Sequence, residues 1–214
     1  MISYEVSIKC GNLLDEKADI LVNPSNTLML LGSGVSRAFF CRCGGGELEC
    51  LMQEKLKNSS LKPGEVLKTI SNNENFTHIF HAAVLNYTFK NLPKYPNLDV
   101  IKNILNNIDN EILKYGKFDI KLGIPLIGCG IGGLNKKNVI NLYKKHFIKN
   151  NSVNIKCRVM IYGYTKEDFN LINEIFKYEI VPFILQFIPF IKVIAPNDLN
   201  EYLKKLLRKY LKSI

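Results

Sequence analysis

The stretch LGIPLIGCGIGGL, at residues 122–134, decides the fold class of this chain. Its first part, Leu122–Ile127, carries no polar side chain, which is typical of a central β-strand covered on both faces. Four glycines follow within the six residues Gly128–Gly133, and an amphipathic helical pattern begins near Lys136. A buried strand, a glycine loop and a helix in this order predict an α/β protein.

Outward from this stretch, short β-type runs alternate with helical patterns as far as residue 178. The other expected strands are Val6–Cys10, Ile20–Asn23, Val66–Ile70, His78–Val84 and Asn154–Gly163. A first helical segment is expected after the loop Gly32–Gly34, with a break at Gly44–Gly46 and a continuation over Glu47–Leu56. Further helices are expected from Ile101, from Lys136 and over Glu167–Tyr178. This alternation predicts an α/β/α arrangement of three layers, with a mixed sheet between helices.

The chain changes character after Tyr178, so we expect one domain over residues 1–178 and a helical extension over residues 179–214. The segment Ile180–Ile194 is apolar but contains prolines, and it is too short to span a bilayer. A last helix, opened by a capping box at Asp198 and Glu201, has one leucine-rich face and one basic face. We expect it to pack against the domain or to form homo-oligomers; binding to a membrane surface is the alternative.

Composition indicates a soluble globular protein, with 47% hydrophobic and 22% charged residues. The first ten residues lack the apolar core of a secretory signal. The only close pair among six cysteines, Cys41 and Cys43, has no matching second pair, so we expect free thiols in the cytoplasm and no metal site. The net charge of +10 favours an anionic partner.

Two glycine loops are candidates for holding a diphosphate. The first, Gly32–Gly34, follows the strand that contains Asn23 and Asn26, and it precedes a helix. The second is Gly128–Gly133. Glycine lets the backbone approach a ligand closely, and the free N–H groups at a helix N-terminus suit phosphate. The amides of Asn23 and Asn26 suit ribose hydroxyls.

Three segments together resemble the macrodomain family, the ADP-ribose-binding or Appr-1-p processing fold. They are ADILVNPSN with LGSGVSRAF (18–26 and 31–39), THIFHAAV (77–84) and GIPLIGCGIGGLNKKNV (123–139). The resemblance extends from about residue 3 to residue 177. It implies a crevice for ADP-ribose at the carboxyl ends of the strands, with no separate cofactor. The ligand would be free ADP-ribose or an ADP-ribosylated protein or nucleic acid.

The resemblance also implies which residues contact this ligand. Asn12 and Leu13 would lie at the adenine, with Tyr164, or alternatively Tyr162, packed on its ring. The distal ribose would be held by the first loop and its asparagines, and the diphosphate by the second loop. The residues concerned are Asn23, Asn26, Gly32, Ser33, Gly34 and Val35 for the first loop, and Gly128, Cys129, Gly130, Ile131, Gly132 and Gly133 for the second.

Departures from the family pattern bear on catalysis. Asn12 stands where the family has an adenine-binding Asp, and Ser36 stands where a hydrolytic branch has an Asp that helps to activate water. Another branch has an Asp at about Gly132, and no lysine here aligns with its nucleophile. The candidates that remain for a catalytic role are Asn26, Ser36 and His81, with His81 favoured as a core residue. Cys129, near a helix N-terminus, is a further candidate nucleophile.

Three functions follow. The first is binding of ADP-ribose or of ADP-ribosylated macromolecules through the two loops. The second is a hydrolase that removes ADP-ribose or its terminal phosphate, with water held by the diphosphate and Asn26. The third is a nucleic-acid-binding protein that uses the basic charge, although the chain lacks aromatic stacking motifs and a groove-reading helix. The absence of a complete catalytic set favours the first.

Overall fold

A computed structural model describes residues 1–88, 95–148 and 155–177 of the chain. Within these residues six strands form one sheet in the order β1-β6-β5-β2-β4-β3. The strands are β1 (Ile2–Cys10), β2 (Ala18–Asn26), β3 (Val66–Ile70), β4 (Phe76–Leu85), β5 (Asp119–Pro125) and β6 (Ile155–Gly163). The helices are the short η1 (Leu13–Asp15), α1 (Gly34–Arg42), α2 (Gly46–Leu56), α3 (Leu98–Leu113), α4 (Lys136–Phe147) and α5 (Lys166–Lys177).

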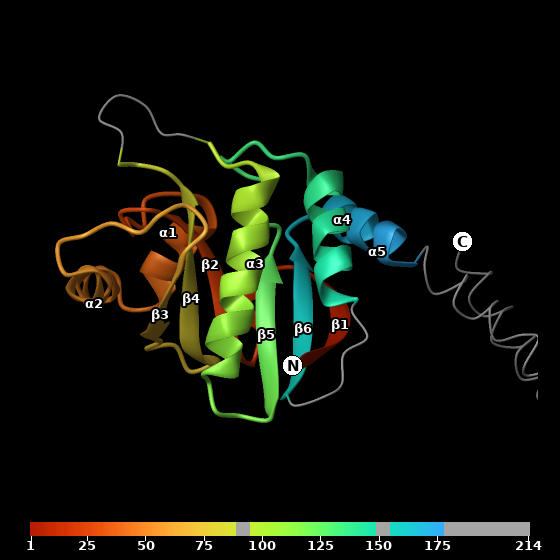
Figure 1. Cartoon of the computed structure of the whole chain (residues 1–214), viewed down its shortest axis with the longest axis horizontal. Helices are drawn as coiled ribbons and strands as arrows, with labels where there is room; N and C mark the ends of the chain where they lie inside the picture. Colours follow the sequence, from red (N-terminus) through yellow and green to blue (C-terminus); the bar gives the residue numbers. More distant parts are fainter. Residues whose placement is uncertain (89–94, 149–154, 178–214) are drawn as a thin grey trace, which may run out of the picture. The chain divides into compact units, whose positions relative to one another are not determined.

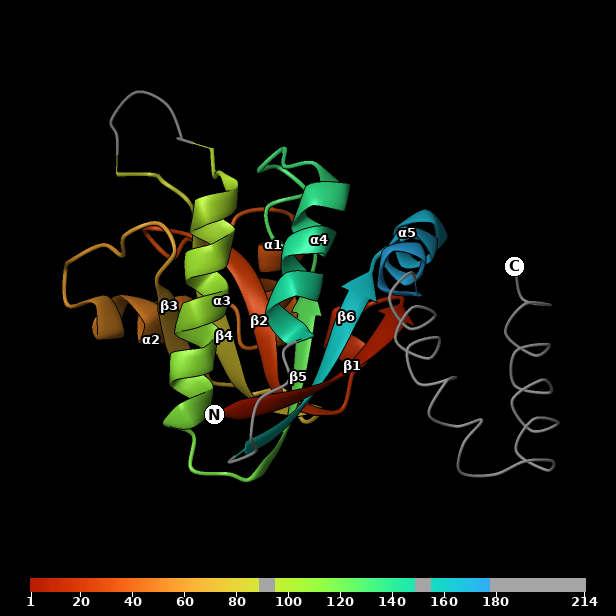
Figure 2. The same ribbon diagram turned by 45° about the vertical axis from the view of Figure 1, so that its right-hand side comes forward.

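The sheet is mixed and lies between helices, as Figures 1 and 2 show. Strands β1, β6, β5, β2 and β4 are parallel, and β3 pairs antiparallel with β4 at one edge. Helices α3 and α4 cover the face turned to the viewer in Figure 1, where α3 contacts β3 and β4 and α4 contacts β1. Helices α1 and α2 cover the other face. The predicted three-layer α/β/α fold is confirmed.

The core explains why these segments adopt these elements. Alternate residues of β2 face opposite helical layers, so Leu21 joins Phe39 of α1 and Met52 of α2 in one buried cluster. On α3, the buried residues recur at the helical spacing that the sequence shows, and Asn97 caps the first turn by accepting from the Val100 N–H. Gly44 and Gly45, with φ of +102° and +57°, separate α1 from α2 in a conformation that side chains disfavour.

Some expected boundaries were wrong. The apolar run Leu122–Ile127 predicted one strand, but β5 ends at Pro125, and the buried Ile127 belongs to the loop that follows. The Tyr143 hydroxyl, from α4, holds this loop: it accepts from the Ile127 N–H at 3.1 Å and donates to the Pro125 carbonyl at 2.8 Å. β1 begins at Ile2, earlier than its hydrophobicity indicates, because it pairs with β6 along its whole length.

The expected extension over residues 179–214 lies outside the described residues, so its helix and the domain boundary near residue 178 stay predictions. In the described part of the chain, no helix has the length and apolar character needed to cross a membrane.

Candidate functional site

The carboxyl edge of the sheet gathers the loops that the sequence singles out. Because β1, β2, β4, β5 and β6 run parallel, their final residues lie at one edge, the upper edge in Figure 1. The first glycine loop follows β2 and the second follows β5, and these two strands are neighbours in the sheet. Open α/β sheets bind ligands outside the carboxyl ends of their strands.

Asn26, at the end of β2, is engaged by its own loop. Its Oδ1 accepts from the N–H groups of Leu28 at 3.1 Å and Leu30 at 3.3 Å, and its Nδ2 donates to the Leu30 carbonyl at 2.8 Å. The residue is 6% exposed. The amide expected to bind ribose therefore also fixes the shape of the loop that leads to Gly32.

The first glycine loop is open to solvent at the N-terminus of α1. Gly32, Ser33, Gly34 and Val35 are exposed, and an added Cβ at Gly32 or Gly34 would meet no heavy atom within 4 Å. Ser33 caps α1 without a side-chain hydrogen bond. The first N–H groups of a helix lack intrahelical acceptors, so this loop offers free donors beside empty space.

The second glycine loop combines tight internal packing with an exposed tip. Gly128 adopts φ of +78°, and a Cβ at Gly132 would lie 2.5 Å from the Gly128 carbonyl oxygen. Gly130 has neither constraint: its φ is not positive, and an added Cβ would meet nothing within 4 Å. Ile131 beside it is 56% exposed. Gly128 and Gly132 thus serve the loop itself, whereas Gly130 leaves open space that the fold does not use.

Cys129 is not an activated nucleophile in this structure. Burial raises the pKa of its thiol to about 11, which outweighs the lowering effect of Lys136 nearby. The low pKa considered from the sequence, on the ground of a helix N-terminus, is therefore wrong. A thiol with this pKa is almost entirely protonated near neutral pH, and only the thiolate attacks.

His81 lies inside the sheet and not in a crevice. Its Nδ1 lies 3.0 Å from Asn23 Nδ2 and its Nε2 lies 2.8 Å from Thr69 Oγ1. The Asn23 Nδ2 group can only donate, so Nδ1 of His81 accepts and its Nε2 proton is donated to Thr69. Complete burial lowers the pKa of His81 from 6.5 to about 3, so the imidazole is neutral. Asn23 and His81 form a polar network within the core.

The remaining sequence candidates are divided between core and surface. Leu13 is a core residue at 5% exposure, and the buried Ser36 hydroxyl has no hydrogen-bond partner in the described part of the chain. Asn12 is exposed and accepts from the Leu14 N–H at 3.3 Å, capping η1. Tyr164 follows β6 and is 82% exposed, whereas Tyr162 is buried and donates its hydroxyl to Glu16.

An ion pair that sequence reasoning missed lies beside the second loop. Lys136, at the start of α4, contacts Asp168 of α5 at 2.5 Å, and Asp168 is 7% exposed. The pair raises the pKa of Lys136. The two residues are far apart in the chain, and no pattern joins them. They tie the helix after the glycine loop to the helix after Tyr164.

No cluster of three or more His, Cys, Asp or Glu side chains suited to a metal ion occurs among the described residues.

The structure brings Asn12, both glycine loops and Tyr164 to one edge of the sheet. It places Leu13, Asn23, Ser36 and His81 in the interior.

Comparisons with known proteins agree with this geometry. The family model of the Macro domain matches residues 22–143. Uncharacterised proteins of Aquifex aeolicus and Aeropyrum pernix are 25% and 23% identical over 133 and 134 residues, which cover 62% and 63% of this chain and 74% and 66% of theirs.

Two solved structures share the fold. The Oceanobacillus iheyensis macrodomain with ADP has a TM-score of 0.68 at 22% identity, over 83% of this chain and 92% of that one. The Trypanosoma brucei macrodomain in complex with ADP-ribose has a TM-score of 0.61 at 17% identity, over 79% and 68%.

Proposed function

The chain belongs to the macro domain family, and from that premise we propose that it binds ADP-ribose, free or attached to a protein or nucleic acid, at the carboxyl edge of its sheet. One observation carries the proposal: glycine loops follow the neighbouring strands β2 and β5, and Gly32, Gly34 and Gly130 all face open space. The related macrodomains of Oceanobacillus iheyensis and Trypanosoma brucei, solved with ADP and ADP-ribose, support it.

In this proposal the backbone does most of the recognition. The N–H groups of Gly130 and Ile131 in the second loop, and those that begin α1, donate to the diphosphate. A diphosphate gains more from a helix N-terminus than a neutral ligand does, because the helix dipole adds to the hydrogen bonds. The exposed Tyr164 ring stacks on adenine, and the Asn12 amide accepts from its amino group.

Binding is favoured over hydrolysis because no candidate catalytic group is a suitable acid or base near neutral pH, and Asn26 is engaged by its own loop. Ser36 is a buried neutral hydroxyl, the Cys129 thiol has a pKa of about 11, and His81 is buried with a pKa of about 3. A general base works best with a pKa near the operating pH and within reach of the substrate. Hydrolysis assisted by the substrate's own phosphates remains the alternative, which a turnover assay decides.

Calorimetric titration with ADP-ribose, with AMP and ADP as controls, tests the proposal. We expect saturable binding of ADP-ribose that Gly130→Glu abolishes, because the new carboxylate would occupy the open space and repel the diphosphate. Gly46→Glu is the matched control. Gly46 also faces open space, but it is the first residue of α2 and belongs to neither of the two candidate loops. Undiminished binding by Gly130→Glu would contradict the proposed site. Release of ADP-ribose from a modified protein or nucleic acid would add the hydrolase activity.

A further inference from the structure

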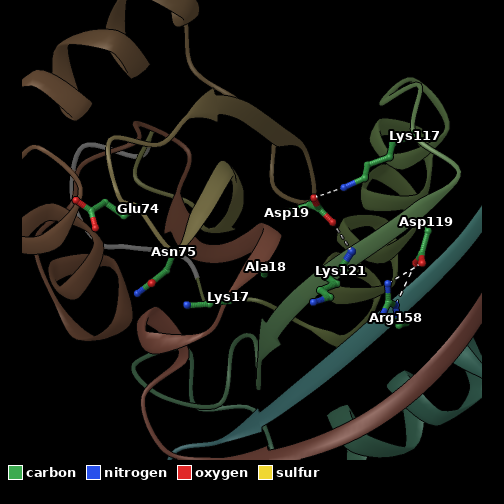
Figure 3. Close-up of a pocket in the computed structure, with 9 residues that line it drawn as sticks. All are labelled: Lys17, Ala18, Asp19, Glu74, Asn75, Lys117, Asp119, Lys121 and Arg158. Atoms are coloured by element: carbon green, nitrogen blue, oxygen red, sulfur yellow. Dashed lines mark hydrogen bonds and ion pairs between the residues drawn. The ribbon is translucent and has the colours of Figure 1, made fainter.

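The opposite edge of the sheet contains a hollow of about 500 Å³, which Figure 3 shows. It lies at the amino ends of β2, β5 and β6, whereas the glycine loops follow the carboxyl ends. Asp19 precedes Leu21 by two residues on β2, and Arg158 precedes Met160 by two on β6, so each pair points to the same face of the sheet. Leu21 and Met160 belong to the core under α1 and α2, so the hollow lies on that face. Four lysine and arginine side chains line it against three carboxylates.

Two of these carboxylates are already neutralised. Asp19 accepts from the Lys117 ammonium at 2.6 Å and from the Lys121 backbone N–H at 2.8 Å. Asp119 binds the Arg158 guanidinium in a two-pronged contact, with distances of 3.0 and 2.6 Å. These pairs hold the walls of the hollow and leave the charges of Lys117 and Arg158 compensated.

Two ammonium groups remain without a carboxylate partner among the described residues: Lys17 and Lys121. Lys121 also lies directly opposite Arg158 in the β5–β6 register, where the Asp119 carboxylate weakens the repulsion between the two like charges. Figure 3 shows Lys17 between Asn75 and Lys121 along the hollow. Glu74, the third carboxylate, lies at the end farthest from Arg158, beyond Asn75.

We propose that this hollow is a binding site for a phosphate group in its dianionic form, held between the Lys17 and Lys121 ammonium groups with the Asn75 amide as a further donor. The two ammonium groups without an ion-pair partner can both donate to a phosphate monoester or inorganic phosphate, which carries nearly two negative charges at neutral pH. A carboxylate or a phosphodiester, with one charge, would attract the two ammonium groups less strongly. The site is separate from the proposed ADP-ribose crevice, so neither proposal depends on the other.

Nuclear magnetic resonance titration of the ¹⁵N-labelled full-length chain tests this site. Inorganic phosphate should shift the amide signals of Lys17, Asn75 and Lys121 along one saturable curve. Any shift of Gly32 and Gly130, which lie in the loops proposed to bind the diphosphate, should follow a separate curve. Glycerol 3-phosphate, as an organic monoester, distinguishes an esterified group from the free ion as ligand. Dimethyl phosphate, with a single charge, should bind more weakly than either.

The double variant Lys17→Gln/Lys121→Gln should weaken phosphate binding by roughly tenfold or more, because each lost ammonium removes a charge-assisted hydrogen bond. Lys55→Gln/Lys102→Gln removes the same charge from exposed positions on α2 and α3 and should bind like the parent chain. Thermal unfolding of both variants verifies that they fold. The proposal is overturned if phosphate causes no saturable shift, or if both double variants weaken binding equally.

Discussion

At the carboxyl edge of the sheet the chain presents glycine backbone, whereas at the amino edge it presents charged side chains. Two asparagines of β2 are engaged within the fold: Asn23 donates to His81, and Asn26 binds the backbone of its own loop. At the amino edge, Lys17 and Lys121 have no ion-pair partner among the described residues. The comparison separates polar groups that the fold requires from polar groups that it leaves available. Substitutions at the two edges should therefore differ in their effect on stability.

The largest effect is expected for His81→Ala. The substitution leaves a cavity inside the sheet and removes the hydrogen-bond partner of both Asn23 and Thr69. Unsatisfied buried polar groups cost about 1–3 kcal/mol each, so the free energy of unfolding should fall by roughly 3 kcal/mol or more. Urea unfolding measures it. His78→Ala on the same strand is the control; His78 is only partly buried, and its loss should cost roughly 1 kcal/mol. If the free energy of unfolding fell no more for His81→Ala than for His78→Ala, the hydrogen bonds of His81 would not add to stability in the way described.

The same network should make stability depend on pH. His81 has a lower pKa in the folded state, about 3, than its ordinary value of 6.5, so between these values the unfolded chain binds a proton that the folded chain does not. Stability due to this residue is therefore complete above about pH 6.5 and falls as the pH decreases, by about 2 kcal/mol at pH 5. Urea unfolding at pH 7 and pH 5 should show a larger loss in the parent chain than in His81→Gln, where only His78, whose pKa burial also lowers, still contributes in this way. Parallel losses would exclude His81 as the cause.

The second glycine loop allows a comparison within one edge. Gly132→Ala places a Cβ 2.5 Å from the Gly128 carbonyl oxygen, so the loop backbone must shift, and the free energy of unfolding should fall by about 2 kcal/mol. Gly130→Ala, two residues away, meets nothing within 4 Å and should change stability little. Thermal unfolding of both variants measures the difference. If Gly130→Ala were equally destabilising, its open space would be a need of the fold and not a place for a ligand.

The layers of the fold follow from the sequence because each helix and strand carries its own periodicity. The three glycines 44–46 predicted the break between α1 and α2, and the stripe from Ile101 predicted α3. The sequence did not show where β5 ends, since Leu126 and Ile127 stay apolar after the strand has finished. A run of apolar residues indicates burial but not the backbone conformation. The buried loop after β5, whose Ile127 N–H donates to the Tyr143 hydroxyl, therefore has the same apolar pattern as a strand.

Individual roles at the two edges could be predicted only in part. Both glycine loops were predicted from their position between a strand and a helix. Nothing in the sequence distinguishes Gly132, which packs on Gly128, from Gly130, whose added Cβ would meet nothing within 4 Å. The ligand roles proposed for these residues stay predictions. The hollow was not foreseen, because Lys17 precedes β2, Lys121 lies on β5 and Arg158 on β6, and the order of these strands in the sheet differs from their order in the chain. Only the register of β5 against β6 places Lys121 opposite Arg158.

The smallest effects are expected at the amino edge. Lys121→Gln removes a charge that lies opposite Arg158, so the free energy of unfolding should stay unchanged or rise by a few tenths of a kcal/mol. Arg158→Gln removes the partner of Asp119, and because the pair is partly exposed the loss should be about 0.5 kcal/mol. Urea unfolding at low ionic strength resolves the sign. A clear loss on Lys121→Gln would mean that its ammonium is required by the fold, and the two edges would then not differ in the way described. A gain would indicate a repulsion that the protein retains for a purpose other than stability.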